Sequence, residues 1–239
     1  MPMLSLVIPT YNERSNILPL LENISKALKD RLHEVVIVDD NSPDETWLLV
    51  QEFSKQHPCV RLIRRMHERG LSSAVIAGFE RARGDILGVM DADHSHDVCL
   101  LPKMIQLIEN KEADCVIGSR RIAGGGADHW PWHRRCFSGL ATFLAYLLTC
   151  VRVSDPLSGF FCVRRDAYEN YKSLFRPKGY KILLEILVKA KPEKIIELPY
   201  VFVDRKQDHS KLSLGIAVAY FAQLIELLRV RLKMKNHGQ

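Results

Sequence analysis

The first half of the chain alternates short, wholly apolar runs with segments of helical spacing, and this alternation restricts the available folds more than any other feature. The apolar runs predict strands at Leu4–Ile8, Val35–Val38, Val60–Ile63, Asp85–Met90 and Asp114–Ile117. Between them, helices are predicted at Ile17–Lys29, Pro43–Lys55, Ser72–Ala82 and Leu100–Glu109. Strands that are apolar on both faces and alternate with helices are typical of parallel sheets. We therefore predict an α/β fold with a mainly parallel central sheet, helices on both faces, and ligands at the carboxyl ends of the strands.

The second half of the chain is less regular. A glycine-rich, mobile loop is predicted at Ile122–Pro131. It is followed by a predicted helix at Arg134–Thr149, a strand at Ser158–Val163, a helix at Ile182–Lys189, an extended segment at Ile195–Val203 and a C-terminal helix at Leu212–Lys235. Because no repeat or low-complexity linker divides the chain, we predict one domain over residues 1–211 and a helical appendage over residues 212–239.

The composition is that of a globular protein with a basic surface. The 239 residues are 47% apolar and 26% charged, with a formal net charge of +6. The length fits one α/β domain, and the charge favours an anionic partner: nucleic acid, a phosphorylated metabolite or an acidic lipid surface. A nucleic-acid-binding module has the net charge and the basic run Arg61–Arg69 in its favour. No nucleic-acid motif accompanies that run and no aromatics interleave it, so we expect no nucleic-acid partner.

The six cysteines contain no C-x-x-C pair, and most of them lie in apolar runs. We therefore expect buried, reduced thiols in a cytosolic protein rather than zinc ligands or disulfides. The segment Met1–Pro9 has no basic region, so no signal peptide is expected. No stretch approaches the roughly 20 uninterrupted apolar residues of a spanning helix.

Two aspartates follow the fourth predicted strand. Asp91 and Asp93 stand one residue apart where the chain leaves an apolar run. Because the chain turns at a strand's end, both carboxylates can reach one ligand, and their hard oxygens suit Mg²⁺ or Mn²⁺ shared with substrate phosphates. Such an ion neutralises the charge on a departing nucleoside diphosphate. The alternative is that these aspartates cap the following helix.

Two further polar clusters end strands at the same predicted edge of the sheet. Pro9–Glu13 follows the first strand, and Asp39–Ser42 follows the second. The second cluster fits either a carboxylate that binds a nucleobase or ribose, or a turn that starts the next helix. Since the carboxyl ends of parallel strands meet at one edge, we expect both clusters to converge with Asp91 and Asp93.

The order and spacing of these motifs resemble family 2 glycosyltransferases. The segments that carry this resemblance are Val7–Glu13, Val38–Asp44, Asp91–Asp93 and Gly118–Arg120. Later segments resemble the dolichyl-phosphate mannose synthases of that family, namely Asp155–Phe161, Gly179–Glu185, Phe202–Arg205 and Ser210–Leu212. The resemblance implies a GT-A fold, with residues 1–211 as a metal-dependent catalytic domain that moves mannose from GDP-mannose to dolichyl or polyprenyl phosphate with inversion. UDP-glucose or another UDP-sugar is the alternative donor.

The resemblance also implies roles for individual residues. The positions implied to hold the nucleotide sugar are Pro9, Tyr11, Glu13, Val38, Asp40, Asp91, Ala92, Asp93, Arg205 and Lys211. Those implied to hold Mg²⁺ or Mn²⁺ are Asp91, Asp93 and Ser95, and those implied to meet the acceptor phosphate are Arg120, Arg134, Ser138 and Lys181. The residues implied to be catalytic are Asp93, Arg120 and Arg205.

A phosphate acceptor needs positioning rather than deprotonation, because its oxygens are already anionic near neutral pH. Arginine suits this task, since its planar fork binds phosphate oxygens in pairs. We therefore expect Arg120, Arg134 and Arg205 to place positive charge at the reaction centre, with no carboxylate acting as a base. We interpret His94 and His96 as loop histidines, because Mg²⁺ and Mn²⁺ prefer oxygen ligands.

The C-terminal segment Leu214–Leu228 is apolar, and the basic residues after it are Arg229, Arg231, Lys233 and Lys235. An apolar stretch with a basic flank suits an amphipathic helix in the plane of an anionic membrane surface. The alternative is a helix packed on the catalytic domain. We predict that residues 212–239 attach the protein peripherally to the cytoplasmic face of a membrane, alone or with a small membrane subunit.

Overall fold

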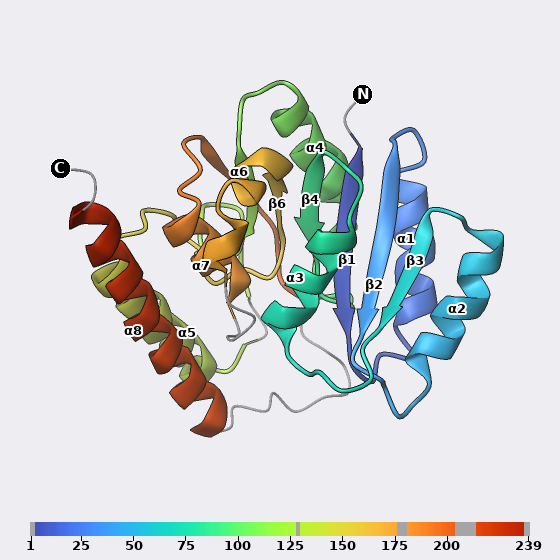
Figure 1. Ribbon diagram of the computed structural model, residues 1–239, viewed down its shortest axis with the longest axis horizontal. Helices are drawn as coiled ribbons and strands as arrows, with labels where there is room; N and C mark the ends of the chain where they lie inside the picture. The colour runs from blue at the N-terminus through green and yellow to red at the C-terminus, as the bar shows by residue number, and fades with distance from the viewer. Residues whose placement is uncertain (1–2, 128–129, 176–180, 204–213, 237–239) are drawn as a thin grey trace.

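A seven-stranded sheet forms the centre of the molecule (Figure 1). The computed structural model describes residues 3–127, 130–175, 181–203 and 214–236. The strands, in chain order, are β1 (Leu4–Thr10), β2 (His33–Asp39), β3 (Val60–Arg64), β4 (Ile86–Val89), β5 (Cys115–Ser119), β6 (Phe161–Arg164) and β7 (Ile195–Pro199). Across the sheet they follow the order β3-β2-β1-β4-β6-β5-β7.

The sheet is parallel except at β6, which runs antiparallel to both β4 and β5. The prediction of a mainly parallel sheet is therefore confirmed. The predicted strand at Ser158–Val163 starts too early, because Ser158 belongs to a turn in which its hydroxyl donates to the carbonyl of Gly118 at 2.7 Å. Since β6 is reversed, this turn lies at the carboxyl ends of β4 and β5.

Helices cover both faces of the sheet, as predicted. They are α1 (Ile17–Ala27), α2 (Thr46–Gln56), α3 (Leu71–Arg81), α4 (Leu101–Glu109), α5 (Trp132–Thr149), α6 (Arg165–Glu169), α7 (Ile182–Lys189) and α8 (Leu214–Asn236), with short 3₁₀ turns η1 (Val98–Leu100) and η2 (Lys172–Leu174). Alternate side chains of β1 point to opposite faces. Leu6 and Ile8 join the core under α1 and α4, whereas Val7 joins the core under α3 and α7.

The helices α5 and α8 lie side by side at one end of the molecule, next to α7 (Figure 1). Leu224 and Leu227 of α8 pack with Leu184 of α7 and Ala145 of α5 in a third apolar cluster. Gln223 of α8 is also buried there. The described part of the C-terminal helix therefore packs on neighbouring helices. The division at residue 211 stays a prediction, because residues 204–213 lie outside the described residues.

No helix in the described ranges combines the length and the apolar character that crossing a membrane requires.

The cysteines are all reduced, but the prediction that they are buried is wrong for half of them. Cys115 and Cys162 are buried in the sheet, and burial raises the pKa of the Cys162 thiol to about 12. Cys99, Cys136 and Cys150 are exposed. An apolar neighbourhood in the sequence does not ensure burial, since Leu101 is in the core while Cys99 is exposed.

Two helical glycines give a matched test of packing. A Cβ added to Gly78 of α3 would lie 2.4 Å from Cγ1 of Val7, whereas one added to Gly139 of α5 meets nothing within 4 Å. We expect Gly78→Ala to lower the free energy of unfolding by about 1–3 kcal/mol through overpacking. Gly139→Ala should raise it by about 0.5–1 kcal/mol, because alanine favours the helix.

Urea unfolding of the two variants measures both values. Equal stability of the two variants would contradict the close contact of α3 with β1.

Candidate active site

A cleft opens at the carboxyl ends of β1, β2 and β4, where ligand sites are expected in such sheets. Its volume is about 370 Å³. The residues that line it are Pro9, Thr10, Tyr11, Glu13, Asp40, Arg69, Gly70, Leu71, Ala74, Asp91 and Ala92. The structure thus brings together the three polar clusters that the sequence places after separate strands.

The adjacent aspartates Asp39 and Asp40 have different surroundings. Asp39 is fully buried and accepts hydrogen bonds from the hydroxyls of Thr10 (2.8 Å) and Ser42 (2.7 Å) and from the Ser42 amide (2.8 Å). It therefore joins the loops that follow β1 and β2. Asp39 therefore fits the alternative in which this cluster forms a turn before the next helix. That helix, α2, starts at Thr46 rather than at the predicted Pro43.

Asp40 lines the cleft and forms hydrogen bonds with the segment Arg65–Gly70. Its Oδ1 accepts from Nε of Arg65 at 2.7 Å, and its Oδ2 accepts from the amide of Gly70 at 2.9 Å. Gly70 has φ of 140°, a conformation that favours glycine. The next side chain, Arg69, lies with its guanidinium carbon 4.8 Å from the Tyr11 ring centroid. Asp40 thereby orders the segment that places Arg69 over Tyr11.

Asp91 and Asp93 follow β4 and do not cap the next helix. That role belongs to Asp97, which accepts from the amide of Cys99 at 2.9 Å. Asp91 reaches the cleft and rests against Gly159, where a Cβ would lie 3.0 Å from Oδ2. Asp93 accepts from the hydroxyl (2.5 Å) and amide (3.1 Å) of Ser95.

His96 lies in the loop between β4 and η1, as predicted, but its side chain is buried. Its Nε2 lies 3.2 Å from Oδ2 of Asp91, and its Nδ1 lies 2.9 Å from the hydroxyl of Tyr200. The ring stacks on Phe160 with centroids 5.1 Å apart. The histidine therefore fixes the orientation of the Asp91 carboxylate. Sequence reasoning missed this role because Tyr200 and Phe160, which hold the ring in place, lie far along the chain. The Nε2 atom of the other histidine, His94, lies 3.0 Å from the backbone carbonyl oxygen of Asn16.

The oxygen atoms of this segment fit a divalent cation that shares its coordination with a phosphate ligand. Two carboxylates and a hydroxyl are hard donors of the kind that Mg²⁺ and Mn²⁺ prefer. Within the ranges that the structure describes, no group of three or more His, Cys, Asp and Glu side chains can hold an ion by itself. A cation at Asp91 and Asp93 would thus depend on oxygens from its ligand.

Arg120, at the end of β5, forms a bidentate ion pair with Asp155. Its Nε and Nη2 donate to the two carboxylate oxygens at 2.7 and 2.8 Å, and the side chains are 14% and 0% exposed. Burial alone would raise the pKa of Asp155, but the hydrogen bonds from Arg120 bring it below its usual value. For the same reason the pKa of Arg120 is raised in spite of burial, with a smaller contribution from Asp91.

Lys181 lies directly before α7 and near the Arg120–Asp155 pair. Its Nζ donates to the carbonyl of Leu157 at 3.2 Å. Burial lowers the pKa of the ammonium group, and the charge of Arg120 lowers it further, while Asp91 opposes both. Lys181 thus lies within electrostatic reach of both Arg120 and Asp91.

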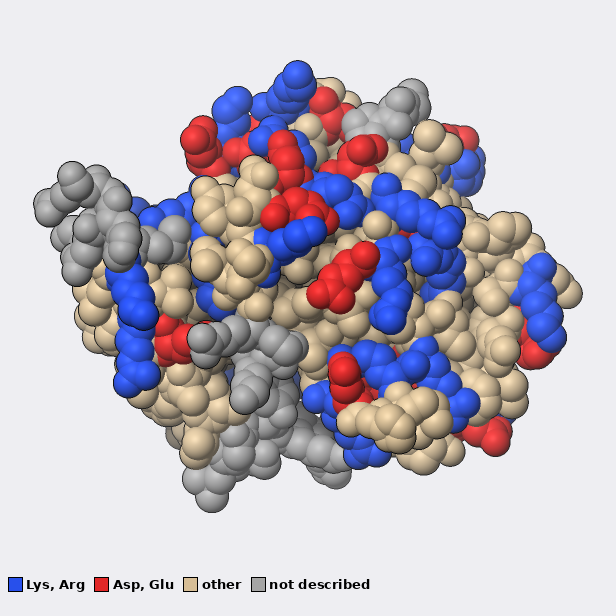
Figure 2. All heavy atoms as spheres, in the orientation of Figure 1, with Lys and Arg blue, Asp and Glu red and all other residues tan. Residues whose placement is uncertain are grey.

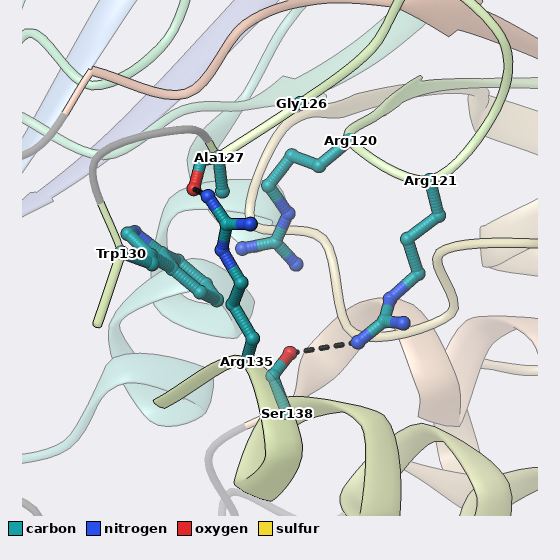
Figure 3. A pocket seen from close by; sticks show the side chains of 7 residues that line it. All are labelled: Arg120, Arg121, Gly126, Ala127, Trp130, Arg135 and Ser138. Carbon is teal, nitrogen blue, oxygen red and sulfur yellow. Dashed lines mark hydrogen bonds between the residues drawn. The ribbon is translucent and has the colours of Figure 1, made fainter. Parts of the chain in front are cut away.

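A second hollow, of about 300 Å³, adjoins Arg120 (Figure 3). Ser138, one of the positions implied to meet the acceptor phosphate, lines this hollow, and so do Arg121 and Arg135, which the sequence analysis did not single out. Arg121 donates from Nη2 to the Ser138 hydroxyl at 2.8 Å. Arg134 instead lies over the Trp130 ring, 4.2 Å from its centroid. Only the folded positions of α5 and the segment after β5 show which arginines face the hollow.

Residues 5–172 match the family described as Glycosyl transferase family 2. The chain belongs to this family. A dolichol-phosphate mannosyltransferase of Pyrococcus furiosus is 43% identical over 227 residues, which cover 94% of this chain and 63% of that protein. This chain therefore spans less than two thirds of that relative. One of Saccharomyces cerevisiae is 36% identical, with 93% of this chain and 86% of that protein covered.

Solved structures share the fold of this glycosyltransferase. Glucosyl-3-phosphoglycerate synthase from Mycobacterium tuberculosis, in complex with Mn²⁺, UDP-glucose and phosphoglyceric acid, has a TM-score of 0.68 and 20% identity, and covers 96% of this chain and 79% of that one. A mannosyltransferase from Pyrobaculum calidifontis, in complex with GDP-Man and Mn²⁺, has a TM-score of 0.65 and 21% identity, with 94% and 64% covered. The GT-A fold is thus confirmed.

The remaining residues implied to act in this glycosyltransferase have three different placements. Pro9, Tyr11, Glu13 and Ala92 line the cleft. Val38 is fully buried, and its side chain belongs to the core under α3. Arg205 and Lys211 lie outside the described residues, so their roles stay predictions.

The Arg120–Asp155 pair predicts a large effect on stability. Asp155→Asn leaves the Arg120 charge buried without its carboxylate, so we expect a loss of about 3–5 kcal/mol in the free energy of unfolding. The matched control is Asp166→Asn, which breaks an exposed pair with Arg164 and should cost no more than about 1 kcal/mol. Equal losses in the two variants would contradict the assignment.

The same pair predicts a dependence on pH. The folded protein holds the Asp155 proton less tightly than the unfolded chain does, because its pKa is lowered. Its stabilisation is therefore present above the ordinary carboxyl pKa of about 4 and is lost as the pH falls through the lower folded value. Unfolding measured between pH 7 and pH 3 should show a shallower acid loss for Asp155→Asn than for the wild type.

Proposed function

We propose that this glycosyltransferase moves mannose from GDP-mannose to dolichyl phosphate or a related polyprenyl phosphate. The observation that carries the proposal is the proximity of Arg120 to Asp91. Asp91 lines the cleft at the carboxyl edge of the sheet, Arg120 lines the arginine-rich hollow, and the two side chains lie within electrostatic reach of each other. The relatives named dolichol-phosphate mannosyltransferase, similar over 93 to 96% of this chain, support this choice of substrates.

The cleft beside β1 and β2 receives the donor nucleotide. Tyr11 and Arg69 offer an aromatic face and a cation, and Asp40 holds the wall that carries Arg69. Asp91 and Asp93 would hold Mg²⁺ or Mn²⁺, whose chemistry is to neutralise the charge that develops on the departing diphosphate. Ser95 orients Asp93 and His96 orients Asp91 for that task.

The acceptor phosphate needs no general base. An oxygen that is already anionic forms the new bond to the anomeric carbon, and the bond from that carbon to the diphosphate breaks, so that GDP leaves with the bonding electrons. Displacement from the opposite side inverts the anomeric configuration. Lys181, which is half-buried and within electrostatic reach of Asp91, supplies positive charge where the two anions would otherwise repel each other.

Product analysis tests the donor and the acceptor together. Purified protein is incubated with polyprenyl phosphate, Mn²⁺ or Mg²⁺, and either GDP-mannose or UDP-glucose, and the lipids are analysed by mass spectrometry. We expect lipid-linked mannose from GDP-mannose. Lipid-linked glucose alone would favour the UDP-sugar alternative, and no lipid product from either donor would refute the proposal.

The acidic pair is tested by comparing two aspartates of one segment. We expect Asp93→Asn to lower kcat/KM by about 100-fold or more, because it removes charge that acts at the departing diphosphate. Asp97→Asn, at an exposed cap a few residues away, should leave kcat/KM within a factor of two. The Mn²⁺-dependent increase in GDP affinity, measured by calorimetry, should be lost only in the first variant. Similar behaviour of both variants would contradict a metal site at Asp93.

We further propose that α5 and α8 together contact a membrane surface. Nine large apolar side chains of these two helices are 49 to 77% exposed. They are Trp132, Phe137, Leu140, Phe143, Leu147, Val218, Phe221, Ile225 and Leu232. Leu140, Phe143 and Leu147 recur at the spacing of one helix face. Figure 2 shows basic side chains along α8 at the left of the view, where Arg229 and Arg231 belong to the helix. Apolar and basic groups on one surface suit an anionic bilayer.

Liposome binding tests this surface. Leu147→Asp places a charge on α5, and Leu32→Asp places one on a distant loop at nearly the same exposure (62% and 60%). We expect only Leu147→Asp to reduce sedimentation with phosphatidylglycerol vesicles, by about fivefold, since an aspartate resists burial in the interface. Equal effects would contradict the proposed face. If the wild type does not bind the vesicles, direct attachment through α5 and α8 is refuted, and attachment to the cytoplasmic face of a membrane would need a membrane partner.

A further inference from the structure

We propose that Gln223 of α8 is a positioning residue for Lys181, so that docking of the C-terminal helix places a cation in the active site. The inference rests on the proposed function, in which Lys181 supplies positive charge where the donor and acceptor anions meet. Its support comes from the contact between the start of α7 and the buried side of α8. The two helices lie against each other at one end of the molecule (Figure 1).

Gln223 joins α8 to the backbone of Lys181. Its side chain is buried, and its amide nitrogen donates to the carbonyl of Lys181 at 3.2 Å and to Oε1 of Glu185 at 3.0 Å. The Lys181 carbonyl also accepts from the amide of Glu185 at 3.3 Å, which is the bond with which an N-cap residue opens its helix. One side-chain amide of α8 therefore holds both the N-cap residue and the first turn of α7.

The other oxygen of Glu185 belongs to a buried ion pair. Its Oε2 accepts from Nζ of Lys189 at 2.8 Å, and the two side chains are 2% and 1% exposed. Leu184 of α7 and Leu227 of α8 belong to the apolar cluster around this pair. Apolar contacts tolerate sliding of one helix along another, whereas a buried carboxylate needs its partners. A shift of α8 by one turn, about 5.4 Å, would take Gln223 away from Glu185, so these polar contacts fix the register of the two helices.

The side chain of Lys181 extends from this backbone to the active-site edge. Its Nζ donates to the carbonyl of Leu157 at 3.2 Å, in the turn before β6. The charges of Arg120 and Asp91 both reach this ammonium group. An ammonium has three hydrogens, so Lys181 can donate to a ligand oxygen while it keeps its bond to Leu157. The place of this charge depends on where α7 begins, which the contact with Gln223 sets.

The opposite side of α8 carries apolar side chains that we propose to meet a membrane. Phe221 and Ile225 are exposed, whereas Gln223 and Leu227 are buried against the neighbouring helices. One side of the helix can therefore lie on a lipid surface while the other holds α7. The helix that attaches the protein to its lipid substrate is also the helix that holds the Lys181 backbone.

Kinetics with farnesyl phosphate test the inference, because this short acceptor needs no membrane. Gln223→Met keeps the length of the side chain and removes its donor amide. We expect it to lower kcat by about tenfold and to leave the KM for GDP-mannose within a factor of two, because a displaced charge acts on the transition state more than on donor binding. A kcat equal to that of the wild type would overturn the inference.

Tyr220→Phe is the matched control on the same helix. The Tyr220 hydroxyl donates to the carbonyl of Ala141 in α5 at 2.8 Å, so this variant also removes a bond from α8 to a backbone carbonyl, but not one to Lys181. Both variants should lower the midpoint of thermal unfolding by about 2–4 °C. Only Gln223→Met should lower kcat, and an equal loss of kcat in both variants would reduce Gln223 to a stabilising contact.

A second substitution, Lys181→Met, separates positioning from a purely structural role. It keeps the backbone carbonyl that Gln223 binds, so a structural effect of Gln223→Met persists in this background. If Gln223 acts through the Lys181 ammonium, adding Gln223→Met to Lys181→Met should change kcat by less than about twofold. A further loss of about tenfold in the double variant would refute the inference.

Hydrogen exchange tests the contact without turnover. Gln223→Met should speed exchange of the Glu185 amide in the first turn of α7, whereas Tyr220→Phe should not. Equal exchange in the two variants would refute the contact. Absence of lipid-linked mannose from the wild type would refute the proposed function, while a normal wild-type rate that Gln223→Met shares would refute this inference alone.

Discussion

The buried ion pair between Arg120 and Asp155 is the interaction on which the rest of the active-site edge depends. It joins the end of β5 to the turn before β6, and Glu197 of β7 holds the same turn by accepting from the amides of Ser154 (2.8 Å) and Asp155 (3.0 Å). A carboxylate without exposure to solvent requires such partners. The turn fixed in this way supplies the carbonyl for Lys181 and the glycine that rests against Asp91.

The reversed direction of β6 explains how its preceding turn comes to lie at the carboxyl edge of the sheet, beside the cleft. Had β6 been parallel, the turn before it would lie at the opposite edge. Instead, this turn brings Phe160 against His96, and His96 orients Asp91 beside the donor cleft. Arg120, which the same turn holds through Asp155, lines the hollow together with Arg121. The turn therefore connects the residues of the cleft with those of the hollow.

Much of this fold follows from local signals in the sequence. The apolar runs of β1, β2 and β4 place polar residues at the sheet's carboxyl edge, and the cleft forms there as predicted. These local signals do not predict the contacts of adjacent residues of the same type. Asp39 and Asp40 are chemically identical, yet one joins two loops and the other holds Arg65. His96 lies in a turn without periodicity, so nothing local indicates that it is buried against Tyr200.

The sequence by itself determined the α/β sheet, the edge at which the polar clusters gather, and the acidic pair that follows β4, because periodicity and strand ends are properties of adjacent residues. Only the tertiary structure decided which charges are available to a ligand. Arg120 is neutralised by a carboxylate 35 positions away, while its neighbour Arg121 reaches Ser138 on α5. Desolvation and pairing set the behaviour of a charged group, and both depend on contacts between segments that are distant in the chain.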